Sequence, residues 1–169
     1  DDFILRHGGH WLLREIRLYW TRVLKRLDVT SRSLMALIEA GDGCSGTLFE
    51  LALACDRIYM LDGNDSSAIS LSAMNFGRLP MANGLSRLQT RFLGDLSRIT
   101  ELRKAMGKLL SAQVAYSLGL VTGIPDEIDW DEEVRLAIEE RSSFSSDALT
   151  GLEANLRFAG PETIETKIF

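Results

Sequence analysis

The chain has 169 residues, of which 46% are hydrophobic, 25% charged and 8% aromatic. These values are typical of one globular domain and exclude disordered, collagen-like and disulfide-framework chains. The net charge of −5 and the pI of about 5.1 argue against a nucleic-acid-binding protein, and the short apolar runs argue against a membrane span. Two cysteines, Cys44 and Cys55, fit a reduced cytoplasmic protein.

The first expected element is a helix over residues 11–27. Apolar side chains recur there every three or four positions, as one helical face requires: Leu12, Ile16, Tyr19, Val23 and Leu27. Basic residues lie mostly off this stripe, where they form a solvated face or meet an anionic ligand. We therefore assign residues 1–30 to a leading amphipathic helix.

A strand–turn–helix–strand unit follows. Residues 33–38 form a short apolar run typical of a buried strand, and residues 39–46 are a glycine-rich turn. A helix is expected from Gly46 or Thr47 to Cys55, because this stretch contains good helix formers and no breaker. Residues 56–61 return as a strand, and residues 68–71 are a further candidate strand.

The remainder reads as mostly helical. Glycines end two of the expected helices, Gly94 the first and Gly119 the third. The expected helices cover residues 85–92, 100–110, 111–118, 130–141 and 147–158, with a connector or short strand at 120–124. This divides the chain into a leading helix (1–30), a core with a helical part (31–125) and a C-terminal helical region (126–169).

Both ends of the sequence look cut. The chain opens on Asp1 without an initiator methionine or a signal-peptide pattern. It closes on Phe169 within a helix that Pro161 is expected to open. We therefore expect the chain to be part of a longer protein.

The turn before the helix at Thr47 is the candidate for chemistry. A helix that begins at a glycine-rich turn has free backbone N–H groups, which can stabilise a phosphate or a developing oxyanion. Gly43 and Gly46 would let another group approach the backbone closely. Such turns also occur only because glycine closes them, so the pattern alone leaves both interpretations open.

The motif E-L-A-L-A-C-D at residues 50–56, after an apolar strand and a glycine turn, resembles the signature of the crotonase (enoyl-CoA hydratase/isomerase) superfamily. The resemblance implies an α/β fold with a crotonase-like spiral of β-β-α units and a helical C-terminal region. By position it implies that Thr47, next to Gly46, supplies the oxyanion N–H and that Glu50 is the first acid/base glutamate. Thr47 and Leu48 stand where that family has its second and third glycines.

A second landmark of the superfamily resembles residues 72–88, and a third resembles residues 115–121. The second catalytic glutamate of the family would fall at Ala73, which cannot transfer a proton. The catalytic pair implied by the resemblance is therefore incomplete, with Glu50 alone.

Residues 32–169 are most similar to one branch of the superfamily, the lyases that open the ring of aryl-CoA thioesters in aerobic benzoate degradation. The stretches that carry this similarity are 33–60, 74–92, 119–141 and 147–169. In that branch one polypeptide holds two crotonase-like halves, and the ring-opening carboxylates belong to the first. The resemblance implies that the chain is part of a C-terminal half and works beside a missing N-terminal half. It also implies an acyl-CoA thioester substrate and a homo-oligomer, with no metal, flavin or nicotinamide.

Three functions remain open. In the first, the chain is the scaffold part of an acyl-CoA lyase/hydrolase that opens epoxybenzoyl-CoA by hydrolysis. In the second, it is a catalytically silent interaction or dimerisation domain. A generic enoyl-CoA hydratase/isomerase is the third, but it requires a second carboxylate near Ala73, and the nearest preceding acids are Asp62 and Asp65. His7 and His10 have no visible third ligand, so no metal site is expected.

Overall fold

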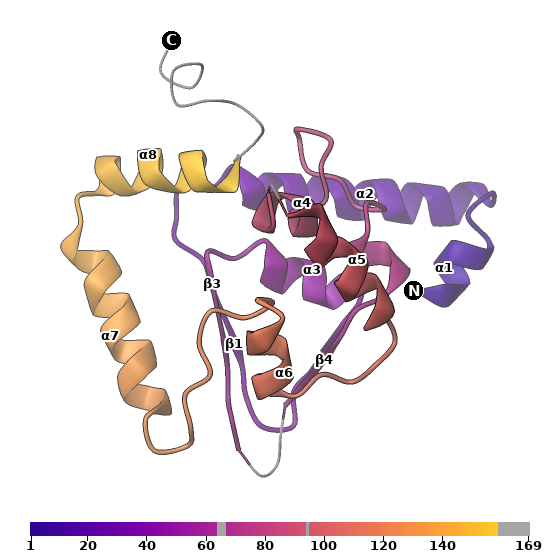
Figure 1. Cartoon of the computed structure of the whole chain (residues 1–169). Helices are drawn as coiled ribbons and strands as arrows, with labels where there is room; N and C mark the ends of the chain where they lie inside the picture. The colour runs from indigo at the N-terminus through magenta and orange to yellow at the C-terminus, as the bar shows by residue number, and fades with distance from the viewer. Residues whose placement is uncertain (64–66, 94, 159–169) are drawn as a thin grey trace.

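The computed structural model describes residues 1–63, 67–93 and 95–158 (Figure 1). The stop expected at Gly94 and the helix expected at Pro161 lie outside these residues. The helices are α1 (Asp2–Arg6), α2 (Trp11–Asp28), α3 (Thr47–Leu53), α4 (Arg87–Arg91), α5 (Leu96–Lys104), α6 (Ala112–Ser117), α7 (Trp130–Ser143) and α8 (Ser146–Arg157), with a 3-10 turn η1 (Ala73–Asn75). The strands are β1 (Met35–Ile38), β2 (Gly43–Ser45), β3 (Arg57–Met60) and β4 (Ala68–Ser70).

The strands form two parallel pairs around α3. β1 pairs with β3 from Met35 opposite Arg57 to Ile38 opposite Met60, and β2 pairs with β4. α3 connects β2 to β3, so the observed order is two strands, a helix and two strands, with one strand more before the helix than the sequence predicted. The strand β2 corrects the prediction of one continuous turn over residues 39–46. The turn is made at Gly41, where φ is +80°, and the next residues extend to pair with β4.

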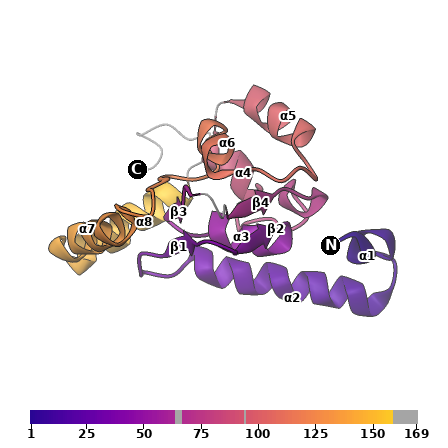
Figure 2. The ribbon, with the colours of Figure 1, turned by 90° about the horizontal axis from the view of Figure 1, so that it is seen from below.

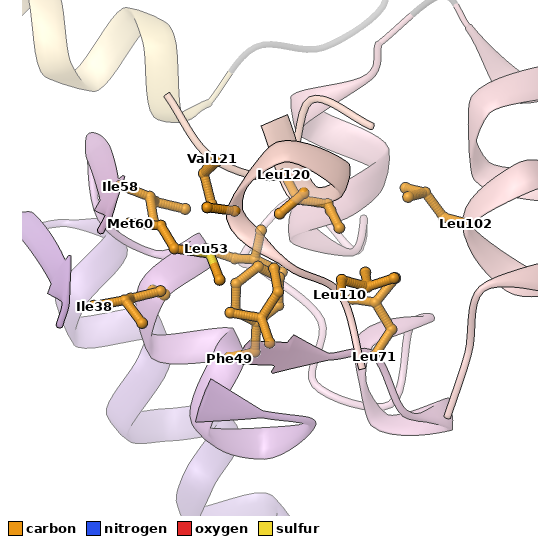
Figure 3. Close-up of a cluster of buried hydrophobic side chains, with 14 of the residues drawn as sticks. Ile38, Phe49, Leu53, Ile58, Met60, Leu71, Leu102, Leu110, Leu120 and Val121 are labelled. Carbon is orange, nitrogen blue, oxygen red and sulfur yellow. The ribbon is translucent and has the colours of Figure 1, made fainter. Parts of the chain in front are cut away.

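The main core lies between these strands and the following helices. Phe49, Ile58 and Leu120 are fully buried within one apolar cluster (Figure 3). α2 lies along one side of the strands, and α4, α5 and α6 lie on the other (Figure 2). Each large apolar side chain buried in this way contributes about 2 kcal/mol of hydrophobic stabilisation.

The predicted helix α2 is present, but most of its apolar stripe is exposed. Leu12 is 45% exposed and Tyr19 is 63% exposed, whereas Leu24 and Asp28 are buried. The inward face therefore lies about one residue away from the apolar stripe. Asp28 explains the rotation, because its carboxylate is held by a buried arginine, Arg87, at 2.6 Å. Apolar periodicity does not register a polar group that is buried with a partner.

The helix expected over residues 100–110 is shifted toward the N-terminus. The side chain of Asp95 accepts a hydrogen bond from the N–H of Arg98, which begins α5 earlier. Gly107 has φ +78° and donates its N–H to the carbonyl of Leu71, so the chain has already left the helix there. The other expected helices are present within a few residues of their predicted bounds. The short helix α1 was not predicted.

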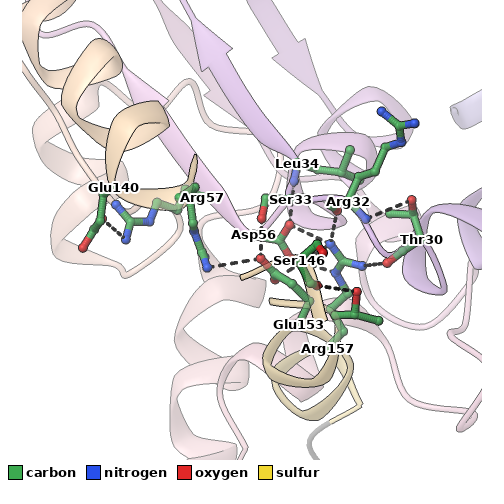
Figure 4. Close-up of polar contacts among 12 residues, drawn as sticks. Thr30, Arg32, Ser33, Leu34, Asp56, Arg57, Glu140, Ser146, Glu153 and Arg157 are labelled. Carbon is green, nitrogen blue, oxygen red and sulfur yellow. Dashed lines mark hydrogen bonds and ion pairs between the residues drawn. The ribbon is translucent and has the colours of Figure 1, made fainter. Parts of the chain in front are cut away.

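Arg157, the last residue of α8, binds groups of the core (Figure 4). Its guanidinium donates to both carboxylate oxygens of Asp56, at 2.8 and 2.7 Å, and to the backbone carbonyls of Thr30 and Arg32. Asp56 also accepts the N–H of Leu34 at 2.6 Å. Burial opposes ionisation of Asp56, but these hydrogen bonds hold its pKa below its usual value. The cluster connects α8 to the start of β3 and to the segment before β1.

Within the described residues, no helix has the length and apolar character that a membrane crossing needs.

Replacing Arg157 by alanine is expected to lower the free energy of unfolding by about 3 kcal/mol, because it leaves a buried carboxylate without its cation. The matched control is Arg135→Ala, which removes two ion pairs whose side chains are more than half exposed. That loss should stay below about 1 kcal/mol. Urea denaturation measures both. Equal losses would show that the Asp56 cluster does not hold α8 to the core.

Candidate active site at the start of α3

Three hydrogen-bond donors converge in front of α3. The backbone N–H of Thr47 donates to the carboxylate of Asp1 at 3.0 Å, and the Thr47 hydroxyl donates to the same carboxylate at 2.6 Å. The hydroxyl of Ser72 donates to it at 2.8 Å. All three donors are therefore engaged by the carboxylate of Asp1, a side chain of the same molecule.

Gly46 is required at this place for two reasons. Its φ is +52°, a backbone conformation that side-chain-bearing residues rarely adopt. A Cβ atom on it would also lie 1.8 Å from the Asp1 carboxylate and 2.8 Å from the Ser72 hydroxyl. Glycine is thus what allows the oxyanion to approach the N–H of Thr47. The donors open on a cavity of about 570 Å³, whose wall includes Gly46, Thr47, Leu48 and Ser72.

Glu50 lies in the same helix but does not line this cavity. Its side chain is 1% exposed, and both carboxylate oxygens are engaged. Asn75 donates its amide to Oε1 at 2.9 Å, and Arg87 donates to Oε2 at 3.1 Å. The same amide nitrogen of Asn75 donates to the carbonyl of Gly46 at 2.9 Å. The structure thus separates the three predicted site residues. Gly46 and Thr47 line the cavity, whereas Glu50 is buried outside it between Asn75 and Arg87.

Arg87 serves two carboxylates at once. It donates to Glu50 and, at 2.8 and 2.6 Å, to both oxygens of Asp28 on α2. All three side chains are at most 2% exposed. Burial raises the pKa of Glu50, and the nearby Asp28 adds to this, while the hydrogen bond from Asn75 and the charge of Arg87 act in the opposite direction.

Sequence reasoning missed Ser72, Arg87 and Asp28 as parts of this region. Ala73 begins η1, and the side chain of Ser72 caps that turn by accepting the N–H of Met74. The spacing of Ser72 and Asn75 was available as a signal, since the two form a reciprocal capping box. The pairing of Asp28 with Arg87 spans 59 residues and leaves no local signal.

No group of three His, Cys, Asp or Glu side chains that could hold a metal occurs in the described part of the chain. The ring of His7 bonds the carbonyl of Phe3, and His10 accepts the N–H of Leu12 at the start of α2. Burial raises the pKa of the Cys55 thiol to about 11 and raises that of Cys44 as well. Neither thiol is therefore a ready nucleophile at neutral pH.

Comparison with solved structures defines the fold class. An enoyl-CoA hydratase from Geobacillus kaustophilus superposes on 99% of this chain with a TM-score of 0.73 at 19% identity, using 61% of its own length. A putative enoyl-CoA hydratase from Thermobifida fusca, in complex with acetoacetyl-CoA, superposes on 93% with a TM-score of 0.67 at 19% identity, using 58% of its length. The chain therefore has the crotonase fold, as the sequence predicted.

The sequence comparison is more specific. Over its whole length the chain is 55% identical to a benzoyl-CoA-dihydrodiol lyase from Aromatoleum evansii. The matched segment makes up 31% of that protein, so the chain spans about a third of its relative. The predicted resemblance to this branch of the superfamily is thus confirmed. No family model matches the sequence.

The raised pKa of Glu50 predicts how stability depends on pH. A carboxyl whose pKa is higher in the folded state than in the unfolded chain stabilises the protein when protonated and loses that contribution as the pH rises through the folded pKa. Relative to Glu50→Gln, the wild-type protein should therefore gain free energy of unfolding as the pH falls from neutral toward the usual pKa of a glutamate. Urea denaturation at several pH values measures the difference, with Glu101→Gln on exposed α5 as control. A relative loss on acidification would contradict the raised pKa.

Proposed function

We propose that this chain is part of an acyl-CoA lyase that opens the ring of epoxybenzoyl-CoA by hydrolysis, and that it supplies no proton-transfer group to that reaction. The identity to a benzoyl-CoA-dihydrodiol lyase supports the class of the whole protein. The state of Glu50 supports the role of this part: both its oxygens are bound by buried partners, and the second glutamate position holds Ala73. Proton transfer requires a group that can reach the substrate, and neither position provides one.

The exposed surface of α2 supports a packing role. Trp11 and Tyr19 are 67% and 63% exposed, and Leu12 and Ile16 lie in the same helix with more than a third of their surface in contact with solvent. Several large apolar side chains exposed on one helix are typical of a surface that packs against another part of a protein. It fits a segment that packs against the remainder of a larger, homo-oligomeric protein. Two free cysteines in the described chain fit a cytoplasmic location.

Glu50→Gln in the whole protein is the direct test of this role. Ring opening of epoxybenzoyl-CoA should keep its kcat/KM within about threefold, because loss of a true general acid or base costs on the order of 100-fold or more. Glu101→Gln is the matched surface control, and thermal melting checks that both variants fold. A loss of 100-fold, or hydration of crotonyl-CoA that Glu50→Gln abolishes, would place catalysis in this part.

A second candidate function is binding of a thioester without turnover, and the donors at Thr47 are the observation that favours it. A backbone N–H can hold a thioester carbonyl whatever side chain its residue carries. Gly46 carries no side chain that would block this N–H, and a thioester carbonyl would take the place of the Asp1 carboxylate that it now binds. This function would leave a pocket for an acyl-CoA beside the catalytic part of the whole protein.

Two substitutions at Thr47 test this binding. Thr47→Pro removes the N–H, and proline is tolerated as the first residue of a helix, so α3 should persist. Thr47→Val keeps the N–H and removes only the hydroxyl. Butyryl-CoA affinity, measured by calorimetry, should fall by up to about tenfold in Thr47→Pro and much less in Thr47→Val, since a hydrogen bond to a neutral carbonyl contributes about 0.5–1.5 kcal/mol. Equal affinities in both variants would exclude binding through this N–H.

A further inference from the structure

A second cavity lies at the opposite end of α3 from Thr47. It has a volume of about 330 Å³, which is in the lower part of the range for small-molecule sites, about 300–1,000 Å³. Its wall combines apolar side chains, among them Leu53, Met81 and Leu156, with charged groups. Four arginines and three carboxylates line it: Arg87, Arg91, Arg141, Arg157, Asp28, Asp56 and Glu153.

Unpartnered buried polar atoms concentrate in this wall. Over the described residues, the buried side-chain nitrogen and oxygen atoms without a hydrogen-bond partner are Nε of Arg87, Nε of Arg141 and Oε2 of Glu153. All three residues line the same cavity. The side chains of Arg87 and Glu153 are 2% and 1% exposed, so bulk water does not satisfy them. Oε2 of Glu153 lies 3.8 Å from the guanidinium of Arg157, which leaves the two N–H groups of Arg87 and Arg141 to be satisfied. Buried polar groups in native proteins are nearly always bonded, so these two donors indicate an occupant that accepts hydrogen bonds.

The charges in the wall indicate the sign of that occupant. Arg87 pairs with Asp28 and with Glu50, which does not line the cavity, and Arg157 pairs with Asp56. Arg141 and Glu153 form a further ion pair at 3.2 Å. Glu153 also lies beside Arg157, as Figure 4 shows.

Arg91 differs from the other three arginines. Its Nε donates to the carbonyl of Gly119 at 2.7 Å, and no carboxylate of the described chain lies within ion-pair distance of it. Burial lowers the pKa of Arg91, but a guanidinium remains protonated at any pH the fold survives. The cavity thus holds one cation without a counter-ion.

We propose that this cavity binds a small organic acid, whose carboxylate pairs with Arg91 and whose apolar body contacts Leu53, Met81 and Leu156. A carboxylate accepts two hydrogen bonds from the planar guanidinium fork, and it can also accept from the unpartnered Nε atoms of the wall. This cavity does not include the donors at Thr47, so the proposal that it binds an organic acid does not depend on the proposed function.

Benzoate is a suitable probe, because it has one carboxylate and a compact apolar body. Saturable binding to the whole protein is expected by calorimetry, with benzamide, its uncharged counterpart, binding at least about tenfold more weakly. Arg91→Gln should weaken benzoate binding about tenfold or more, because a charged hydrogen-bonded pair contributes about 1.5–3 kcal/mol. Arg78→Gln, the same change at an exposed arginine outside the cavity, should leave benzoate binding unaltered.

Each other outcome contradicts the proposal. Absence of saturable benzoate binding, or equal binding by wild type and folded Arg91→Gln, would show that the cavity holds only water. Inorganic phosphate binding as tightly as benzoate would show a general anion site in which the apolar wall has no part. If Arg91→Gln does not fold, Arg91→Lys keeps the charge and loses the planar fork, and it should still weaken benzoate binding measurably.

Discussion

The buried guanidinium of Arg87 is the constraint on which much of this structure depends. It holds Asp28 and Glu50 in an environment where each is at most 2% exposed. An unpaired charge there would cost several kcal/mol, so the three groups must stay together. Through them α2, α3 and α4 are fixed relative to one another. Asn75 extends the same network, because one amide nitrogen bonds both Glu50 and the carbonyl of Gly46. The position of the turn before α3 is thus tied to the ion pair behind it.

This arrangement separates two functions that a crotonase site combines. Stabilising an oxyanion needs only backbone N–H groups at the start of a helix and a glycine that permits close approach. Both persist at Thr47 and Gly46, even though the side chains around the turn differ from the family pattern. Transferring a proton needs a side chain that reaches the substrate, and the carboxylate of Glu50 instead neutralises Arg87. The N–H group at Thr47 and the burial of the Glu50 carboxylate are the two features on which the proposed supporting role of this chain rests.

The sequence predicted those parts of the fold that local signals determine. The helix α3 and the strands β1 and β3 on either side of it follow from residues that are close in the chain, and the E-L-A-L-A-C-D motif indicated the fold family. The failures share a physical cause, which is dependence on distant partners. The strand β2 exists because Ala68–Ser70 offers it hydrogen bonds, and the orientation of α2 depends on a pairing of Asp28 with Arg87 across 59 residues. The site was predicted by position alone, and the burial of Glu50 could not be read from it.

The two cavities at the ends of α3 are chemically unlike because a helix is polar. α3 has seven residues and is therefore about 10 Å long. Its N-terminal end carries a partial positive charge and free N–H groups, which favour an anion without any charged side chain. Its C-terminal end carries a partial negative charge, which favours the guanidinium groups that gather beside Cys55 and Asp56. An anion at that end is not held by the helix and must rely on a cation from elsewhere. Arg91 comes from α4 and is the arginine in that wall that no carboxylate of the described chain neutralises, so the second cavity obtains its anion preference from packing between helices.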